Sequence, residues 1–275
     1  MPSSVIDLIK RSIEEDLGHG DITTRLVIPD ESESRALFIA KDNFILAGFP
    51  FAKEVFTILD PAIIFKTFYN EGDRARKGSV LGEVTGRTHS ILAGERVSLN
   101  MLQRLSGIAT RTRQFVDAVS GLKTRIVDTR KTIPGHRFME KYAVRMGGGN
   151  NHRFGLYDGI LIKDNHIESV GSLKEAVQRA KAGNYLAKIE VEVESLKDVK
   201  EAIEAGADIV MLDNMSVEDM RKAVRIAHGK IKTEASGNIK LKKVREIAET
   251  GVDVISVGAL THSVRAADIS MKIVG

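Results

Sequence analysis

The sequence contains no cysteine among its 275 residues. This absence excludes disulfides, zinc sites built from thiolates, and cysteine nucleophiles. A reducing compartment suits such a chain, so we expect a cytoplasmic protein. Tryptophan is also absent, and aromatic residues make up only 5% of the chain, which leaves few platforms for stacking nucleic-acid bases. A nucleic-acid partner is therefore not expected.

Long apolar runs are missing as well. No run approaches the roughly 20 residues needed to cross a bilayer, so we expect no membrane association. The first helical stretch carries the acids Asp7, Glu14 and Glu15, and it is not expected to be a signal or transit peptide. Hydrophobic residues make up 43% of the chain and charged residues 28%, which is typical of a globular protein.

From about residue 124 the sequence alternates short β-branched runs with amphipathic segments. The runs are TRIVD, GILIKD, KIEVEVE, IVMLD, IKTEAS and DVISVG. The amphipathic segments begin near Ser172, Ser195, Ser216 and Lys240. Ser195 and Ser216 are each followed three residues later by an acid, a pattern typical of helix N-termini. Repeated βα units of this kind predict a parallel α/β barrel, which we assign to residues 108–264.

Residues 1–107 have a different pattern, with short alternating strands such as SRALFIAK and a helix containing ERVSLNMLQRLSG. This predicts a separate α/β domain. The segment DISMKIV, within residues 265–275, alternates like a strand, and we predict that it joins the amino-terminal sheet. EGDRARKGSVLGEVTG resembles a biotinyl or lipoyl carrier hairpin with Lys77 as the attachment site, but the carrier motif around Lys77 is missing.

Polar and small residues recur where the predicted barrel strands end. They are Asp128, Arg130, Lys163, Asp164, Glu192, Glu194, Asp213, Ser236, Gly237 and Gly258. In an α/β barrel the carboxyl ends of the strands face one open mouth, where functional residues gather. Cations, carboxylates and small residues together predict a site for a metal-bound phosphorylated ligand.

The strand KIEVEVE places Glu190, Glu192 and Glu194 on one face. If the intervening valines pack under helices, these acids point into the barrel. Buried acids need cations, and Mg²⁺ is a candidate when the ligand is a pyrophosphate. Structural ion pairs with Lys163 or Lys188 are an equally good explanation.

The segment DTRKTIPGHRFMEKYAVRMGGGNNHR is rich in basic residues and contains three successive glycines. Arginine matches carboxylates through two parallel hydrogen bonds, and glycines let backbone amides approach an anion. The segment therefore predicts a small, highly anionic ligand. A solvated basic helix followed by a flexible loop is the alternative. Neither a dinucleotide fingerprint nor a Walker lysine motif is present.

Several segments together resemble the quinolinate phosphoribosyltransferase family. They are EDLGHGDITT, ERVSLNMLQRLSGIAT, DTRKTIPGHRFMEKYAV, GGGNNHR, LIKDNH, VEVE, DNMS, EASGNI and GVDVISVGALTHS. The similarity runs in order over nearly the whole chain. DTRKT-PG followed by GGG-NHR and LIKDNH is highly specific, whereas DNM or EASG alone is not. Asn238 departs from the pattern, because the family has a glycine after EASG.

The resemblance implies an amino-terminal open sandwich, an incomplete α/β barrel, and a homodimer whose sites each borrow residues from the neighbouring subunit. It also implies a reaction. The phosphoribosyl group of phosphoribosyl pyrophosphate is transferred to quinolinate with decarboxylation, which gives nicotinic acid mononucleotide, CO₂ and pyrophosphate, with Mg²⁺ as the cofactor.

The resemblance also implies roles for individual residues. The acids Glu192 and Asp213 hold Mg²⁺ and stabilise positive charge on the ribose, and Lys131 and Lys163 neutralise the pyrophosphate. The remaining residues bind substrate: Arg130, Arg153, His152 and Lys131 for quinolinate, together with Arg96 of the other subunit, and Ser236, Gly237 and Gly258 for the 5′-phosphate.

Three alternatives remain open on the sequence. A homologue of the same fold, such as the molybdenum-operon protein, would act on another aromatic acid. A phosphate-binding barrel aldolase or decarboxylase would fit the βα rhythm but would not need the basic segment before GGGNNHR. A ligand-binding barrel without catalysis would gain little from Glu192 and Asp213.

Overall fold

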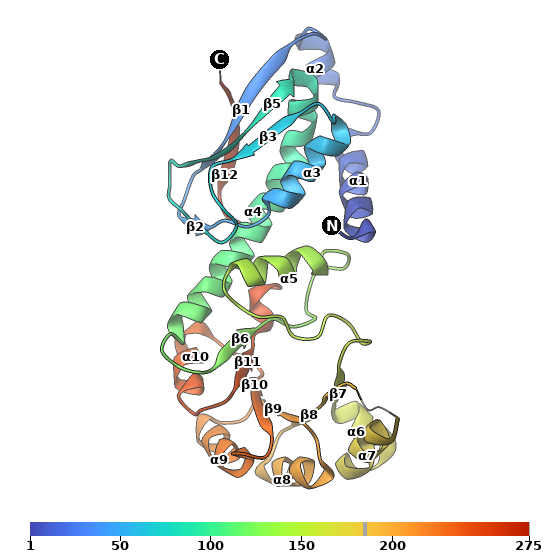
Figure 1. Cartoon of the computed structure of the whole chain (residues 1–275), viewed down its shortest axis with the longest axis vertical. Helices are drawn as coiled ribbons and strands as arrows, with labels where there is room; N and C mark the ends of the chain where they lie inside the picture. The colour runs from blue at the N-terminus through green and yellow to red at the C-terminus, as the bar shows by residue number, and fades with distance from the viewer. Residues whose placement is uncertain (184–185, 275) are drawn as a thin grey trace. The chain divides into compact units, whose positions relative to one another are not determined.

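A computed structural model describes residues 1–183 and 186–274 of the chain (Figure 1). The chain forms two compact units whose segments alternate along the sequence. The first unit comprises Met1–Arg113, Thr132–Gly148 and Ser263–Gly275, and the second comprises Gln114–Lys131 and Gly149–His262.

The first unit is built on an antiparallel sheet with the strand order β12-β1-β5-β3. Its strands are β1 (Glu33–Ala40), β3 (Ile64–Thr67), β5 (Val80–Arg87) and β12 (Ile269–Val274), and a small second sheet pairs β2 (Phe44–Ile45) with β4 (Arg74–Ala75). Its helices are α1 (Ser3–Leu17), α2 (Ile22–Val27), α3 (Phe49–Leu59) and α5 (Arg137–Met146), and α4 (Thr88–Ala118) begins in it. The alternating segment near the carboxyl end thus lies in this sheet, paired antiparallel with β1.

Aromatic side chains fill the space between this sheet and α3. Phe38 of β1 packs edge-on against Phe49 and Phe56, with ring centroids 6.1 and 6.3 Å apart. Gly94 of α4 allows a close approach, since a Cβ at this position would lie 2.6 Å from the ring of Phe56. The alternation of β1 therefore produces one buried face, as expected for a sheet covered on one side.

Residues 132–148 pack in the first unit, although the sequence pattern assigns them to the barrel segment 108–264. The reason lies in the side chains of α5. The ring of Tyr142 packs edge-on against Phe51, and its hydroxyl donates a hydrogen bond of 2.9 Å to Glu71. The carboxylate of Glu71 also accepts the backbone N–H groups of Gly48 and Phe49 at the start of α3. These contacts fix α5 within the first unit.

The second unit is built on a six-stranded parallel sheet with the order β6-β11-β10-β9-β8-β7. Its strands are β6 (Arg125–Val127), β7 (Ile160–Ile162), β8 (Ile189–Val193), β9 (Ile209–Asp213), β10 (Lys232–Ser236) and β11 (Val254–Ser256). The helices α6 (Asp164–Val170), α7 (Leu173–Gly183), α8 (Leu196–Ala205), α9 (Val217–Ala227) and α10 (Leu241–Ala248) lie along the outer side of this curved sheet (Figure 1). In the described part of the chain, β6 and β7 form its two edges, so the barrel is incomplete. The predicted fold class is confirmed.

The helix starts of this unit follow the capping residues in the sequence. The side chain of Ser195 accepts a hydrogen bond from the backbone of Asp198, and Ser216 does the same for Asp219. Both predicted N-caps are confirmed. None of the helices within residues 1–183 and 186–274 combines the length and apolar character needed to span a bilayer.

Candidate active site

A cavity of about 540 Å³ lies in the second unit, at the carboxyl ends of its parallel strands. Residues that follow β6, β9, β10 and β11 contribute to its wall, as expected for a barrel mouth. The wall includes Thr129, Arg130, Lys131, His152, Arg153, Lys163, Glu192, Asp213, Asn214, Glu234, Ser236, Gly237, Asn238, Lys240, Ser256, Gly258 and His262. The structure thus brings together every residue to which the resemblance gives a role, except Arg96. Asp128, Asp164 and Glu194, which also stand at predicted strand ends, do not line the cavity.

Arg96 lies on the first unit, in α4, and its side chain is exposed. It is not among the residues that line the cavity of the second unit.

Several cationic side chains line the cavity, namely Arg130, Lys131, Arg153, Lys163 and Lys240. Burial lowers the pKa of the Arg153 guanidinium, and the positive charge of Arg130 lowers it further. Glu190 and Asp158 oppose the shift. Like charges held together in this way are stabilised by an anion between them.

Three carboxylates line the same cavity, those of Glu192, Asp213 and Glu234. Glu192 of β8 forms an ion pair with Lys163, which follows β7. Asp213 ends β9, and it accepts a hydrogen bond of 2.7 Å from the side chain of Asn214. The sequence left open whether the glutamates of KIEVEVE form ion pairs with Lys163. Glu192 does form this ion pair. Glu194 is exposed and does not line the cavity.

The loop after β10 supplies small and polar groups. Gly237 has φ 88°, and a Cβ at this position would collide with the side chain and backbone nitrogen of Asn214. Asn238 has φ 49°, in the left-handed region that glycine and asparagine adopt most readily. The departure from the family pattern at Asn238 therefore keeps the backbone conformation that a glycine would adopt.

Gly258 begins a short 3₁₀ turn after β11. A Cβ added there would lie 3.0 Å from Lys131 and 3.1 Å from His262. A side chain at residue 258 would therefore crowd the cavity wall.

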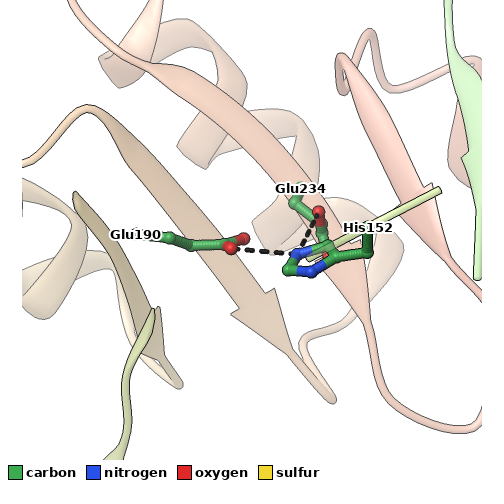
Figure 2. A group of neighbouring side chains, drawn as sticks. All are labelled: His152, Glu190 and Glu234. Atoms are coloured by element: carbon green, nitrogen blue, oxygen red, sulfur yellow. Dashed lines mark hydrogen bonds and ion pairs between the residues drawn. The ribbon is translucent and has the colours of Figure 1, made fainter. Parts of the chain in front are cut away.

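A cluster of one histidine and two buried glutamates was not predicted from the sequence. His152 Nε2 lies 3.0 Å from Glu190 Oε2 and 3.5 Å from Glu234 Oε2 (Figure 2). Glu190 and Glu234 are only 4% and 3% exposed. The alternation of KIEVEVE predicts that Glu190 faces the barrel, but no pattern in the sequence pairs it with Glu234, which lies two strands away.

Burial changes the titration of this cluster. Removal from water and the negative charge of Glu190 raise the pKa of Glu234 to about 7. His152 opposes this shift. Glu234 therefore retains a proton at a pH where an exposed glutamate is ionised.

The fold and the cavity define a class of protein, namely a parallel α/β barrel with a cationic, carboxylate-containing site at its mouth. Comparison with family models is more specific. The quinolinate phosphoribosyl transferase C-terminal domain matches residues 108–272, and the N-terminal domain of the same family matches residues 21–106.

Individual relatives match this chain over nearly its full length. The chain is 46% identical over 267 residues to the probable carboxylating nicotinate-nucleotide pyrophosphorylase of Bacillus subtilis, with 97% of this chain and 92% of the relative covered. The solved structure of the nicotinate-nucleotide pyrophosphorylase from Francisella tularensis is 44% identical, with a TM-score of 0.94 over 100% of this chain and 98% of that one. The NadC structure from Streptococcus pyogenes gives 40% identity and a TM-score of 0.96, with the same coverage. This chain belongs to the quinolinate phosphoribosyltransferase family.

Proposed function

We propose that this chain transfers the phosphoribosyl group of phosphoribosyl pyrophosphate to quinolinate and releases nicotinic acid mononucleotide, CO₂ and pyrophosphate. The observation that carries the proposal is that one cavity is lined by two arginines whose charges interact, Arg130 and Arg153, and by the carboxylates of Glu192 and Asp213. Names of the relatives such as carboxylating nicotinate-nucleotide pyrophosphorylase support the same reaction.

Quinolinate carries two carboxylates, and the cationic side of the cavity suits them. Arg130 and Arg153 each offer a planar fork of N–H donors that matches a carboxylate. Lys131 lies in the same wall. A bound dianion relieves the repulsion between the two guanidinium groups, so the free energy of binding includes a favourable electrostatic contribution.

Mg²⁺ is the proposed cofactor, and the donor set at the cavity suits it. Glu192 and Asp213 offer carboxylate oxygens from the neighbouring strands β8 and β9, and hard oxygen ligands are what Mg²⁺ prefers. When bound, the ion would neutralise charge on the departing pyrophosphate.

The side chains themselves account for the remaining steps. Departure of pyrophosphate leaves positive charge on the ribose, which the carboxylates of Glu192 and Asp213 stabilise. Lys131 and Lys163 neutralise the leaving group. Ser236, Gly237 and Gly258 provide room and hydrogen-bond donors for the 5′-phosphate.

The pyridine nitrogen forms the new bond to the ribose C1 carbon as the bond to pyrophosphate breaks. The bond between ring carbon 2 and its carboxylate then breaks, the electron pair stays on the ring, and that carbon takes up a proton. The nearby cations, including Arg130 and Arg153, stabilise the negative charge that develops on the ring.

A homodimer with shared sites is part of the proposal. Arg96 is an exposed arginine within ERVSLNMLQRLSG, one of the segments that carry the family resemblance. We assign it to quinolinate in the site of the other subunit. Residence in the cytoplasm remains an expectation, which fractionation of cells would test.

The reaction is tested by incubating the purified chain with quinolinate, phosphoribosyl pyrophosphate and Mg²⁺ while following CO₂ and nicotinic acid mononucleotide. Nicotinate is the matched control, because it lacks the 2-carboxylate and would leave cations of the cavity without that partner. Turnover of quinolinate with little or none of nicotinate is expected. Comparable catalytic efficiency on nicotinate would contradict the proposal.

A further inference from the structure

The imidazole of His152 is held at both ring nitrogens by other groups of this chain. Nδ1 accepts a hydrogen bond of 2.8 Å from the backbone N–H of Arg153. A ring nitrogen that accepts carries no proton, so the ring proton lies on Nε2. There it faces Glu190 and Glu234, which approach the ring from two strands (Figure 2).

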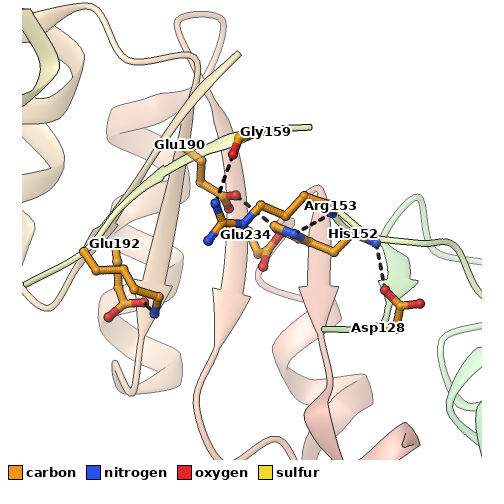
Figure 3. Close-up of polar contacts among 8 residues, drawn as sticks. Asp128, His152, Arg153, Gly159, Glu190, Glu192 and Glu234 are labelled. Carbon is orange, nitrogen blue, oxygen red and sulfur yellow. Dashed lines mark hydrogen bonds and ion pairs between the residues drawn. The ribbon is translucent and has the colours of Figure 1, made fainter. Parts of the chain in front are cut away.

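The backbone before this ring is also fixed by a buried acid. Asp128 is fully buried, at 0% exposed, and its two carboxylate oxygens serve different partners. Oδ1 accepts the backbone N–H of His152 at 2.9 Å (Figure 3). Oδ2 accepts the side-chain amide of Asn151 at 2.5 Å. The segment 151–152 is therefore tied to the end of β6.

Arg153 is held by several of these neighbouring groups. Its backbone nitrogen donates to His152, its guanidinium donates a hydrogen bond of 2.9 Å to the carbonyl of Gly159, and Glu190 attracts its charge. Figure 3 shows the ring of His152 and the side chain of Arg153 next to each other, with Glu190 and Glu234 beside them.

We propose that Glu190 and Glu234 are positioning residues, which hold the ring of His152 and through it fix Arg153 as a ligand of quinolinate. This inference rests on the function proposed above and adds two residues that do not need to touch the substrate. It gives His152 the task of orienting its neighbour through Nδ1.

Stability alone does not explain these two acids. Burying two adjacent carboxylates is unfavourable, and well-packed apolar side chains of similar volume are often neutral or stabilising in such places. Geometry gives the acids another use. Carboxylates that hold one ring nitrogen fix the direction of the other ring nitrogen. The hydrogen bond from the backbone N–H of Arg153 to that second nitrogen then fixes the backbone of Arg153.

The inference predicts a selective kinetic defect. In Glu190→Met and Glu234→Met, the KM for quinolinate should rise by about tenfold or more, because a positioned arginine fork is lost, while the KM for phosphoribosyl pyrophosphate changes little. Glu190→Gln and Glu234→Gln keep an oxygen that can accept from Nε2 and should retain most of the affinity for quinolinate. Glu204→Gln on the exposed side of α8 is the matched control.

A double-substitution cycle tests whether the effect passes through Arg153. Glu190→Met should raise the KM for quinolinate far less in an Arg153→Lys background than in the wild type, because the fork to be positioned is already gone. The tautomer of His152, read from ¹⁵N chemical shifts in histidine-labelled chain without substrate, should change in Glu190→Met and stay as in the wild type in Glu190→Gln.

The outcomes distinguish failure of the proposed reaction from failure of the positioning role of Glu190 and Glu234. Absence of turnover by the wild type would refute the proposed reaction, whereas the ¹⁵N shifts still decide whether the glutamates hold the ring. Equal rises in KM for both substrates, full additivity with Arg153→Lys, or an unchanged tautomer in both Met variants would overturn the inference. So would stoichiometric Zn²⁺ binding that requires His152, Glu190 and Glu234, whose ligand atoms lie within 4.8 Å of one another.

Discussion

Asn238 Nδ2 donates a hydrogen bond of 3.2 Å to Asn214 Oδ1, and both residues have backbone in the left-handed region, with φ 49° and 52°. They follow the neighbouring strands β10 and β9. The hydrogen bond therefore ties together two loops of the cavity wall, each of which needs a conformation that most residues avoid.

This relationship predicts how Asn238 tolerates substitution. Asn238→Gly keeps the backbone conformation and loses one exposed hydrogen bond, so its free energy of unfolding should fall by only about 1 kcal/mol or less. The free energy of unfolding of Asn238→Val should be lower by a further 1–3 kcal/mol or so, because a β-branched residue is strained at positive φ. Urea unfolding measures both. Equal stability of the Gly and Val variants would show that the loop relaxes.

The carboxylates of the cavity should act on the rate more than on quinolinate binding. Glu192→Gln and Asp213→Asn should lower kcat by about a hundredfold or more while the Kd for quinolinate changes severalfold at most, since the proposed work of both acids lies in the transition state. Rapid-quench kinetics and equilibrium binding provide the two numbers. If the affinity for quinolinate collapsed while kcat stayed unchanged, the proposed role of these acids in the transition state would be wrong.

The shared-site proposal predicts complementation between two damaged chains. Arg96→Ala and Glu192→Ala should each be nearly inactive alone, and random exchange of subunits should restore about a quarter of wild-type activity, since mixed twofold dimers carry one intact site. If Arg96 serves its own subunit, every site keeps a lesion and no activity returns. A fully active Arg96→Ala would contradict the proposal directly. In that case Arg96 would be a surface residue whose ion pairs contribute about 1 kcal/mol or less.

Glu234 should make the stability of the chain depend on pH. Its pKa is raised from 4.5 to about 7 in the fold, so between these values the folded chain binds more protons than the unfolded chain and stability falls as pH rises. Glu234→Gln cannot ionise there. Its Tm relative to the wild type should therefore rise from about pH 5 to about pH 7 and then level off. A difference that stays constant with pH would mean that Glu234 titrates like an exposed acid.

Tyr142 should stabilise the first unit through its hydroxyl. Tyr142→Phe leaves Glu71 without one donor in a part-buried site, where burial already raises the pKa of Glu71, and should lower the free energy of unfolding by about 1–2 kcal/mol. Tyr157→Phe is the control, because Tyr157 is 81% exposed. An equal effect of the two substitutions would show that the hydrogen bond contributes nothing.

Local patterns in the sequence predict the barrel well. Its six strands are short β-branched runs, and Ser195 and Ser216 mark helix starts because capping depends on residues only three positions apart. The location of α5 could not be predicted in this way. Its basic, amphipathic sequence fits either unit, and the partners that decide it, Phe51 and Glu71, lie far away in the sequence.

Local sequence patterns likewise predict only part of the candidate site. Arg130, Lys163 and Asp213 stand at strand ends, so their gathering at one mouth follows from the barrel itself. The contact of Glu234 with His152 depends on how far each side chain reaches across a curved sheet, and alternation does not specify that.

The alternation of segments between the two units has a consequence for synthesis on the ribosome. The chain passes from the first unit to the second, returns for Thr132–Gly148, and returns again for β12. The sheet of the first unit therefore lacks its edge strand β12 until residue 274 has been translated, whereas every strand of the barrel has been made by residue 256. The later-encoded unit can thus complete its sheet first, and during that interval the edge of β1 that pairs with β12 has unpaired backbone N–H and C=O groups.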